Sequence, residues 1–295
     1  MYKIEPLAQH PQLYNQVIKL IEKAYQYSPD ESFEVDFCPL INKKNWENCF
    51  LIFANEGNEL IGHIGCKPRY LQLKHQKISC VFLGGIALEK KYRGKGIFKK
   101  SFEQILSNLS RTYEYAILWS DQLDLYKKFK FNTYYFSQLK LSNKQHPQFT
   151  PPIGYEKIVF QNLSKKNQME IKDLYEKYVN HHHISVFRSE EDWKELMSIK
   201  SASMFVKYSE NKIQSYFILG KGQDLQGIIH EYAFNDTNTE ITQEFSENSV
   251  LIHQNEKSKN WINIPSALIK NLKGSKFLED YSSNESLYIS GLDSI

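Results

Sequence analysis

The stretch "KKYRGKGIFKK", residues 90–100, decides how this chain is interpreted. It follows directly on the apolar segment "CVFLGGIAL" (80–88) and leads into the helical pattern of "IFKKSFEQILSNLS" (97–110). A glycine-containing loop between a strand and a helix presents main-chain N–H groups that have no helical partner, and the helix dipole adds positive charge there. Such a loop binds phosphate. A surface turn with solvated lysines has a similar composition, so the remaining sequence must distinguish the two.

The composition is that of a globular protein. The chain has 295 residues, of which 41% are hydrophobic and 24% charged, and this length predicts two domains. A net charge of +3 argues against a general nucleic-acid-binding protein. No signal-peptide pattern and no apolar run near about 18 residues is present, so we expect a cytoplasmic protein without a membrane partner. The four cysteines lack CxxC spacing, which favours reduced thiols over disulfides or a zinc site.

The first half of the chain alternates predicted strands and helices. The segment 78–88 is dense in apolar residues, so we expect a central strand that is covered on both faces. The predicted strands are 2–7, 49–54, 59–74, 78–88, 115–120 and 132–141, with a turn at 55–58, and the predicted helices are 11–27, 97–110 and 124–129.

The second half repeats this order. Residues 155–179 match the opening strand and helix, and 203–222 match the strand–turn–strand after that helix. "LQGIIHEYAF" (225–234) corresponds to "FLGGIAL" (82–88), but no arginine and no glycine pair come after it. The sequence therefore predicts a duplicated architecture with one phosphate-binding loop. The predicted organisation is a first domain at 1–144, a Pro-rich linker at 145–154 and a second domain at 155–295.

The loop resembles a known motif. "YRGKGIFKKSFEQIL" (92–106) is similar to the acyl-CoA-binding motif of the GNAT superfamily of N-acetyltransferases, written [R/Q]-x-x-G-x-[G/A]. Arg93, Gly96 and Phe98 take its key positions. Phe98 departs from the family, which prefers a small residue there, and a larger side chain narrows the approach to the pyrophosphate.

A second segment strengthens the resemblance. "LYKKFKF" (125–131) is similar to the family's "LYEKLGF", with Lys130 in place of the usual glycine. The resemblance covers about residues 1–142 and extends to the second half by architecture only. It implies an α/β fold of the α+β mixed-sheet kind, with two tandem GNAT-like domains, each a mixed, mostly antiparallel sheet flanked by helices. The second domain would be degenerate.

The resemblance also implies acetyl-CoA as the acyl donor. In the family, the strand before the loop pairs with the pantetheine arm, and the loop amides hold the pyrophosphate. Basic side chains of the loop would add charge-assisted contacts to phosphate oxygens. The candidate cofactor-binding residues are Ile86, Ala87, Leu88, Arg93, Gly94, Lys95, Gly96, Ile97 and Phe98.

Candidate catalytic residues have less support. Tyr126 occupies the position of the family's general acid, which protonates the CoA thiolate, and a pKa near ~10 suits that task; a half-buried aromatic residue closing a helix is the alternative. For the general base, Asp121 and Glu89 lie at strand ends, where a carboxylate is more commonly a solvated loop acid than a base. Glu231, beside His230, lies in a buried-looking strand where a charge suggests a role, although a core histidine and an edge glutamate are the more common explanation of such a pair.

Two further features concern metal binding and the end of the chain. Adjacent side chains of "NHHHIS" (180–185) point in different directions, so we expect no metal site. In some tandem relatives the C-terminal carboxylate enters the active site, and the ending "LYISGLDSI" (287–295) allows this.

The expected function is that of an acetyl-CoA-dependent N-acyltransferase that acts by direct transfer in a ternary complex, since no cysteine suggests a covalent intermediate. The competing class is a non-catalytic acyl-CoA-binding or regulatory protein, and a third is a scaffold whose basic loop binds another phosphate ligand. The amine acceptor, a small molecule or a protein amine, and the oligomeric state stay open.

Overall fold

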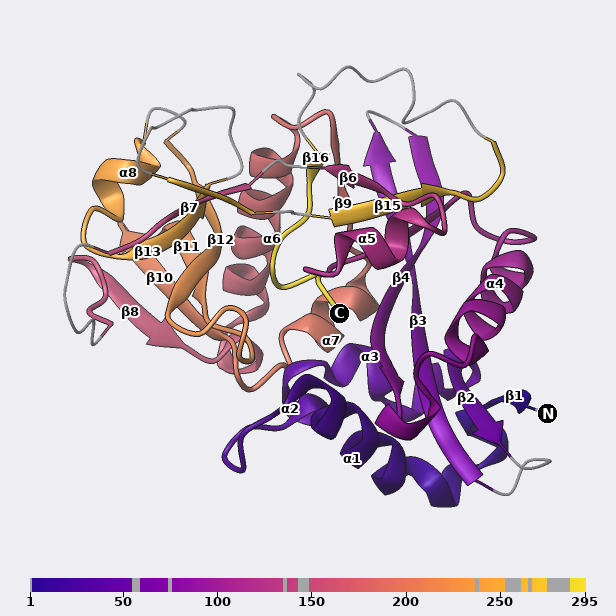
Figure 1. The fold of residues 1–295 in the computed structure, drawn as a ribbon. Helices are drawn as coiled ribbons and strands as arrows, with labels where there is room; N and C mark the ends of the chain where they lie inside the picture. Colours follow the sequence, from indigo (N-terminus) through magenta and orange to yellow (C-terminus); the bar gives the residue numbers. More distant parts are fainter. Residues whose placement is uncertain are drawn as a thin grey trace.

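The fold consists of two mixed sheets flanked by helices, with the C-terminus between them (Figure 1). The computed structural model describes residues 2–54, 59–73, 76–134, 137–142, 149–236, 239–252, 261–264, 267–274 and 287–295. The predicted turn at 55–58, part of the strand at 132–141, and residues 145–148 of the predicted linker lie outside the described residues.

Along its main strands the first sheet is antiparallel except at its central strands β4 (Gln76–Leu88) and β5 (Tyr115–Leu118), which pair in parallel. Two short strands extend the sheet: β9 (Ile184–Phe187) pairs antiparallel with β3 (Glu59–Leu73), and β16 (Leu287–Tyr288) pairs parallel with β9. The order of the main strands is β1 (Tyr2–Pro6), β2 (Cys49–Ala54), β3 (Glu59–Leu73), β4 (Gln76–Leu88), β5 (Tyr115–Leu118), β15 (Ala267–Asn271) and β6 (Asn132–Tyr134).

The second sheet repeats the first strand for strand, and again one central pair, β12 and β13, is parallel while the others are antiparallel. The duplicated architecture expected from the sequence is confirmed. In the order that matches the first sheet, its strands are β8 (Tyr155–Ile158), β10 (Ser203–Ser209), β11 (Lys212–Leu219), β12 (Ile228–Phe234), β13 (Ser249–Ile252), β7 (Ser137–Lys140) and β14 (Ile262–Ile264).

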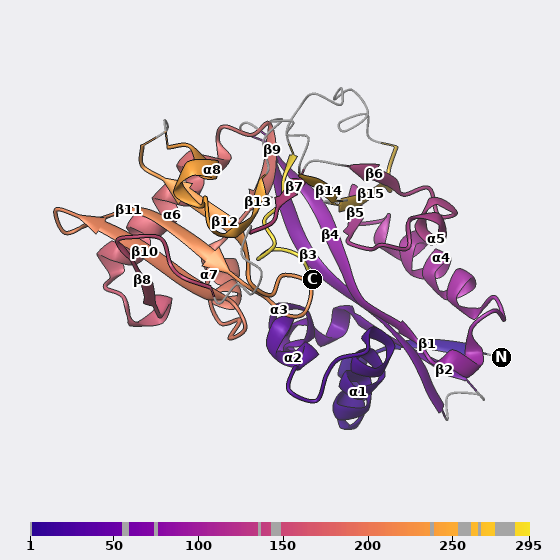
Figure 2. The ribbon, with the colours of Figure 1, turned by 60° about the vertical axis from the view of Figure 1, so that its left-hand side comes forward.

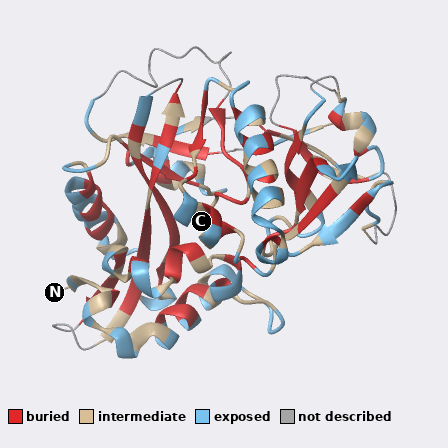
Figure 3. Ribbon diagram, turned by 180° about the vertical axis from the view of Figure 1, so that it is seen from behind, coloured by how far each residue is buried: buried red, intermediate tan, exposed pale blue. Residues whose placement is uncertain are grey.

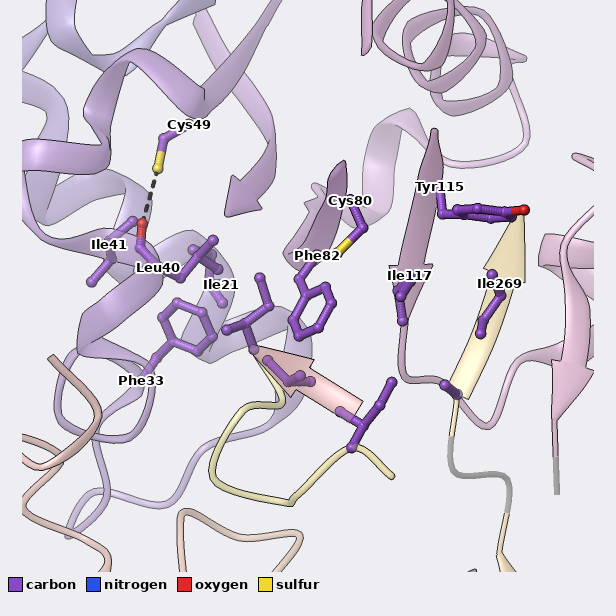
Figure 4. Packing of buried hydrophobic residues seen from close by; sticks show 14 of the residues in the cluster. Ile21, Phe33, Leu40, Ile41, Cys49, Cys80, Phe82, Tyr115, Ile117 and Ile269 are labelled. Atoms are coloured by element: carbon purple, nitrogen blue, oxygen red, sulfur yellow. Dashed lines mark hydrogen bonds between the residues drawn. The ribbon is translucent and has the colours of Figure 1, made fainter. Parts of the chain in front are cut away.

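The two sheets exchange one strand each. β7 comes after β6 in sequence but lies between β13 and β14, and β15 crosses back to lie between β5 and β6. Ile269 of β15 is paired with Ile117 of β5, and the two side chains lie together in Figure 4. The single closing strand predicted at 132–141 is therefore wrong, because this segment contains two strands, β6 and β7, that belong to different sheets. The domain boundary at 144 stays a prediction, and strands cross it in both directions.

Helices cover both faces of the first sheet (Figures 1 and 2). The predicted helix at 11–27 is shorter than expected, since Pro11–Leu13 forms a 3-10 turn and Gln26 ends the helix with a φ of 59°. The helices are α1 (Tyr14–Tyr25), α2 (Phe33–Asp36), α3 (Cys38–Ile41), α4 (Ile97–Leu109), α5 (Leu123–Lys127), α6 (Lys165–Val179), α7 (Glu190–Leu196) and α8 (Ile241–Glu244). Short 3-10 helices lie at Leu7–Gln9, Pro11–Leu13, Lys43–Asn48, Lys90–Tyr92 and Phe160–Asn162.

The core places β4 at the centre, as the sequence predicted. Cys80 and Phe82 face the cluster that contains α1, and Val81 and Leu83 face the cluster that contains α4. The buried strands and the exposed outer sides of the helices are visible in Figure 3. Each such side chain contributes about 1.5–3 kcal/mol by burial, so β4 rigidly supports the loop at its end. No helix in the described part of the chain is long and apolar enough to span a membrane.

Candidate active site

The site begins where the parallel strands β4 and β5 part. Their pairing runs from Cys80 opposite Tyr115 to Leu83 opposite Leu118. Beyond that point β5 ends, while β4 continues along β3 to Leu88. The carboxyl ends of parallel strands in an open sheet are where ligand crevices form.

A bulge at Gly85 lies in β4 just beyond Leu83, the last residue of β4 that pairs with β5. His63 and Gly65 are two residues apart in β3, whereas their partners Ala87 and Gly84 are three residues apart in β4, so β4 contains one extra residue here. Gly85 has a φ of 56°, which glycine adopts without strain. The His63 Nδ1–H donates to the Gly85 carbonyl at 2.7 Å, because a carbonyl can only accept. Burial lowers the pKa of His63 to about 4, so a neutral, fully buried ring fixes the bulge.

A cavity of about 900 Å³ opens between the diverging strands. Its walls come from four parts of the chain, and the second half contributes one of them. Grouped by origin, the lining residues are Leu83–Leu88, Tyr92–Gly94 and Gly96–Phe98; Ala24, Tyr25, Tyr27, Phe33 and Phe37; Trp119–Leu123, Leu125 and Tyr126; and Gln223, Asp224, Ile264, Ser294 and Ile295.

The glycine loop forms one end of this cavity. Gly94 and Gly96 both have a φ of 75°, and a Cβ atom on either would meet nothing within 4 Å. The main chain that precedes α4 therefore faces open space, as an anion-binding helix start requires. Arg93 Nε donates to the Leu88 carbonyl at 3.0 Å, which ties the loop to the end of β4. Lys95 does not line the cavity.

Phe98, the departure from the family motif, packs against aromatic rings. Its ring stacks on Phe102 with centroids 5.2 Å apart and meets Phe129 edge-on at 5.7 Å. It also contacts Tyr126, edge-on at 6.5 Å. Such pairs contribute about 0.5–1.5 kcal/mol each beyond burial. Phe98 thus joins α4 to α5 while it lines the cavity.

Tyr126 lies in the cavity wall on α5. It is 6% exposed and is held by the rings of Phe102 and Phe131. Its hydroxyl makes no hydrogen bond to any residue that the structure describes. Burial raises its pKa above the ordinary value of a tyrosine, so the hydroxyl stays protonated at neutral pH and can donate.

Three other polar groups share the cavity, and two of them were missed at the sequence level. Asp121, a predicted site residue, lies after β5, Tyr25 ends α1, and Asp224 comes from the loop after β11. The Tyr25 hydroxyl accepts a hydrogen bond from the Ile86 N–H at 3.1 Å. Desolvation raises the pKa of Tyr25 to about 12 and also raises the pKa of Asp224.

Glu231, a predicted catalytic residue, lies outside this cavity. It is fully buried and does not line the cavity. Both terminal nitrogens of Arg188 donate to its carboxylate, at 2.9 and 2.6 Å, and Arg188 also pairs with Asp293 at 2.8 Å. Burial would raise the pKa of Glu231, but the guanidinium lowers it overall. Arg188 thus explains the buried charge, and Glu231 has no part in the mechanism proposed below.

Glu89 and His230, the other polar candidates near strands, also have structural partners. Glu89 pairs with Lys23 at 3.1 Å, outside the cavity lining. The His230 ring lies 2.8 Å from the Gly220 carbonyl through Nε2. Asp121 and Tyr126 are thus the predicted catalytic residues that the fold brings to the same cavity as the loop.

The last residues of the chain are held against β4. Lys221 Nζ donates to the carbonyls of Gly291 and Leu292, each at 3.1 Å, and to that of Ser294. A Cβ atom on Gly84 would lie 2.5 Å from main-chain atoms of Ile295. Only glycine at residue 84 permits this approach, so the segment after β16 forms part of the cavity wall.

The three consecutive histidines lie in a separate hollow of about 250 Å³ with Gln72 and Ser185. Within the described ranges, His, Cys, Asp and Glu side chains form no group that could hold a metal ion. The four cysteines are free thiols, and none lines the large cavity.

Residues 8–134 match a family model described as an acetyltransferase (GNAT) domain. The matched range includes the bulge, the glycine loop and Tyr126. Over this range the chain is similar to a GNAT domain. Asp224 and the last residues of the cavity wall lie beyond the matched range. A search of curated protein sequences gave no match.

Solved structures are similar to the GNAT domain and the second half together. A conserved Enterococcus faecalis protein described as a probable N-acyltransferase is 16% identical, with a TM-score of 0.65 over 95% of this chain and 75% of that one. A GCN5-related N-acetyltransferase from Anabaena variabilis is 15% identical, with 0.64 over 92% and 73%. Saccharomyces cerevisiae N-myristoyltransferase with bound myristoyl-CoA is 10% identical, with 0.59 over 91% and 80%. At these identities the likeness shows the fold.

Proposed function

We propose that the protein transfers an acetyl group from acetyl-CoA to an amine acceptor, by direct attack within a ternary complex. The GNAT domain supports acyl transfer from an acyl-CoA donor in general. The observation that carries the finer proposal is the Tyr126 hydroxyl, which is protonated, without a described partner, and in one cavity with the bulge and the glycine loop.

The donor site fits the residues present. The space above Gly94 and Gly96 is open, so their main chain can approach a pyrophosphate without a Cβ in the way. The edge of β4 from Ile86 to Leu88 has left β5, and it offers main-chain groups to the pantetheine arm as an added strand would. Arg93 holds the loop in place through Leu88 and leaves its terminal nitrogens for phosphate oxygens.

The proposed transfer needs one group that gives a proton to the leaving thiolate and one that takes a proton from the amine. The amine nitrogen attacks the thioester carbonyl carbon, the C–N bond forms and the C–S bond breaks. The thiolate that leaves takes the proton of the Tyr126 hydroxyl, and solvent later restores that proton. The proton lost by the amine passes to Asp121, directly or through water. Because no cysteine lines the cavity, no covalent acyl-enzyme step is part of the proposal.

The second half closes the acceptor side of the cavity. Its contributions are Gln223, Asp224 and the segment that Lys221 holds against β4. We propose a cytoplasmic location, where acyl-CoA is available.

The competing function is acyl-CoA binding without turnover. Acetyl-CoA, CoA and ATP would each be tested for a rise in melting temperature, since a ligand stabilises the state that binds it. We expect acetyl-CoA to raise the melting temperature and ATP to leave it unchanged; the reverse would favour a general phosphate-binding loop. Incubation with acetyl-CoA and a panel of amines, with mass spectrometry as the readout, would then show an acetylated amine if the protein is an enzyme.

A further inference from the structure

The cavity has two chemically different sides. The donor side consists of β4 after the bulge and the glycine loop, and it carries Arg93. The acceptor side is formed by the end of α1 and by α2, by the residues after β5 and by the loop after β11. Among the described lining residues of this side, Asp121 and Asp224 are the charged side chains, and both are acidic.

The two carboxylates come from different halves of the molecule. Neither side chain makes an ion pair or a hydrogen bond with a residue in the described ranges. The nearby Lys221 is buried and donates to the carbonyls of residues 291–294; its charge acts to lower the pKa of Asp224, but desolvation raises that pKa overall. Both Asp121 and Asp224 raise the pKa of Tyr25. Their negative charge therefore acts on the Tyr25 hydroxyl, which accepts a hydrogen bond from the Ile86 N–H.

A third carboxylate lies behind this wall. Asp36 is 3% exposed, and its Oδ2 atom has no hydrogen-bond partner in the described chain. It raises the pKa of both Tyr27 and Asp224. A buried carboxylate is costly, and its negative field adds to that of the two acids in the cavity.

Aromatic rings form the rest of the acceptor side. Phe33 stacks on Phe37 with centroids 5.0 Å apart and meets Tyr27 edge-on at 6.2 Å. Tyr25 and Trp119 complete the wall. Faces of such rings attract ammonium groups, whereas a carboxylate or phosphate on the acceptor would meet only like charge here.

We propose, on the basis of the proposed function, that the acceptor is a small cationic amine with a second positive charge, a diamine or polyamine. One amino group reaches the thioester beside Ile86 and Tyr126. The other lies beside Asp224, against the aromatic wall. Both acids line a cavity of about 900 Å³, a volume typical of small-molecule sites, which favours a free small molecule over a lysine on a folded protein.

The test compares three acceptors of similar length with acetyl-CoA as donor: cadaverine, pentylamine and aminopentanoate. We expect kcat/KM to be roughly tenfold or more higher for cadaverine than for pentylamine, as one charge-assisted contact allows, and to be lowest for aminopentanoate. Asp224→Asn should reduce the cadaverine-to-pentylamine ratio by roughly tenfold. Its melting temperature and its affinity for acetyl-CoA should stay those of the wild type.

The matched control is Asp173→Asn, an exposed acid on α6 outside the cavity, which should leave the ratio unchanged. Equal kcat/KM for cadaverine and pentylamine, or an unchanged ratio in Asp224→Asn, would overturn the inference and leave the acyltransferase intact. Calorimetric titration of cadaverine into the CoA-bound protein separates the two proposals further. Binding that Asp224→Asn weakens, without turnover of any amine, would support the cation site and contradict the enzyme.

Discussion

The Tyr25 hydroxyl accepts a hydrogen bond of 3.1 Å from the main-chain N–H of Ile86. Tyr25 ends α1, and Ile86 lies just after the bulge of β4, so a helix on one face of the sheet controls the donor group that β4 offers to its ligand. One N–H makes one strong hydrogen bond. An acyl-CoA that binds along β4, as we propose, would therefore displace Tyr25 or share this donor with it.

Tyr25→Phe should bind acetyl-CoA more tightly than the wild type. The substitution leaves the ring and removes the oxygen that occupies the Ile86 N–H, and one net hydrogen bond corresponds to a change of roughly fivefold in Kd. Calorimetry would measure this Kd. Tyr27→Phe, which changes a neighbouring hydroxyl in the same wall, is the control and should leave the Kd unchanged. Weaker binding by Tyr25→Phe would show that the hydroxyl assists the donor.

Gly96→Ala should weaken acetyl-CoA binding beyond its effect on stability. Gly96 has a φ of 75° and open space around a Cβ, and Gly274 has a φ of 72° and equally open space. Each alanine should lower the free energy of unfolding by about 1 kcal/mol because of the left-handed backbone. Only Gly96→Ala places a methyl group in the phosphate cradle. Equal Kd values for the two variants would remove the loop from the donor site.

The protein should lose stability as the pH falls from about 6.5 toward 4, in part through His63. Burial lowers the pKa of His63 to about 4 in the folded state, while the unfolded chain takes up the proton near ~6.5. The unfolded state binds more protons in this window, so stability rises with pH there. Between pH ~6.5 and ~5 the loss is about 2 kcal/mol, at about 1.4 kcal/mol per pH unit.

Urea unfolding of the wild type and of His63→Gln, at both ends of this range, measures the contribution of His63. The pH dependence should be smaller in the variant by that amount. Identical slopes for the two proteins would mean that His63 is protonated in the folded state.

Glu231→Gln should destabilise the fold without changing the pH profile of kcat/KM. The substitution leaves the buried Arg188 with Asp293 as its remaining carboxylate partner among the described residues, and breaking such a group costs about 3 kcal/mol. Glu191→Gln, which removes a surface pair with Lys44, should cost under about 1 kcal/mol. Denaturant unfolding gives both values. Loss of the acidic limb in the pH profile of Glu231→Gln would instead make Glu231 a catalytic base.

The local features of this site could be predicted from the sequence. The apolar density of β4, the glycine loop and the start of α4 are neighbours in sequence, and their order alone indicates a phosphate cradle. Tyr126 is found through a short motif on a short helix. The structure adds a reason why a large residue stands at Phe98, since its ring packs on Phe102 and Phe129.

The features that depend on distant contacts could not be predicted. The exchange of β7 and β15 is decided by which sheet edge each strand reaches, and periodicity carries no such information. Glu231 was interpreted as a candidate base because its partner Arg188 lies 43 residues away. Asp224 had no motif of its own, since only the folded chain brings the loop after β11 to the end of β4.

The most direct test of the proposed function is the rate of CoA release from acetyl-CoA, with and without cadaverine, by the wild type and by Tyr126→Phe. We predict release that depends on the amine, an acetylated amine as product, and a kcat lowered by roughly a hundredfold in Tyr126→Phe with an unchanged Kd for acetyl-CoA. Acetyl-CoA binding without an acetylated product from any amine, or full activity of Tyr126→Phe, would contradict it.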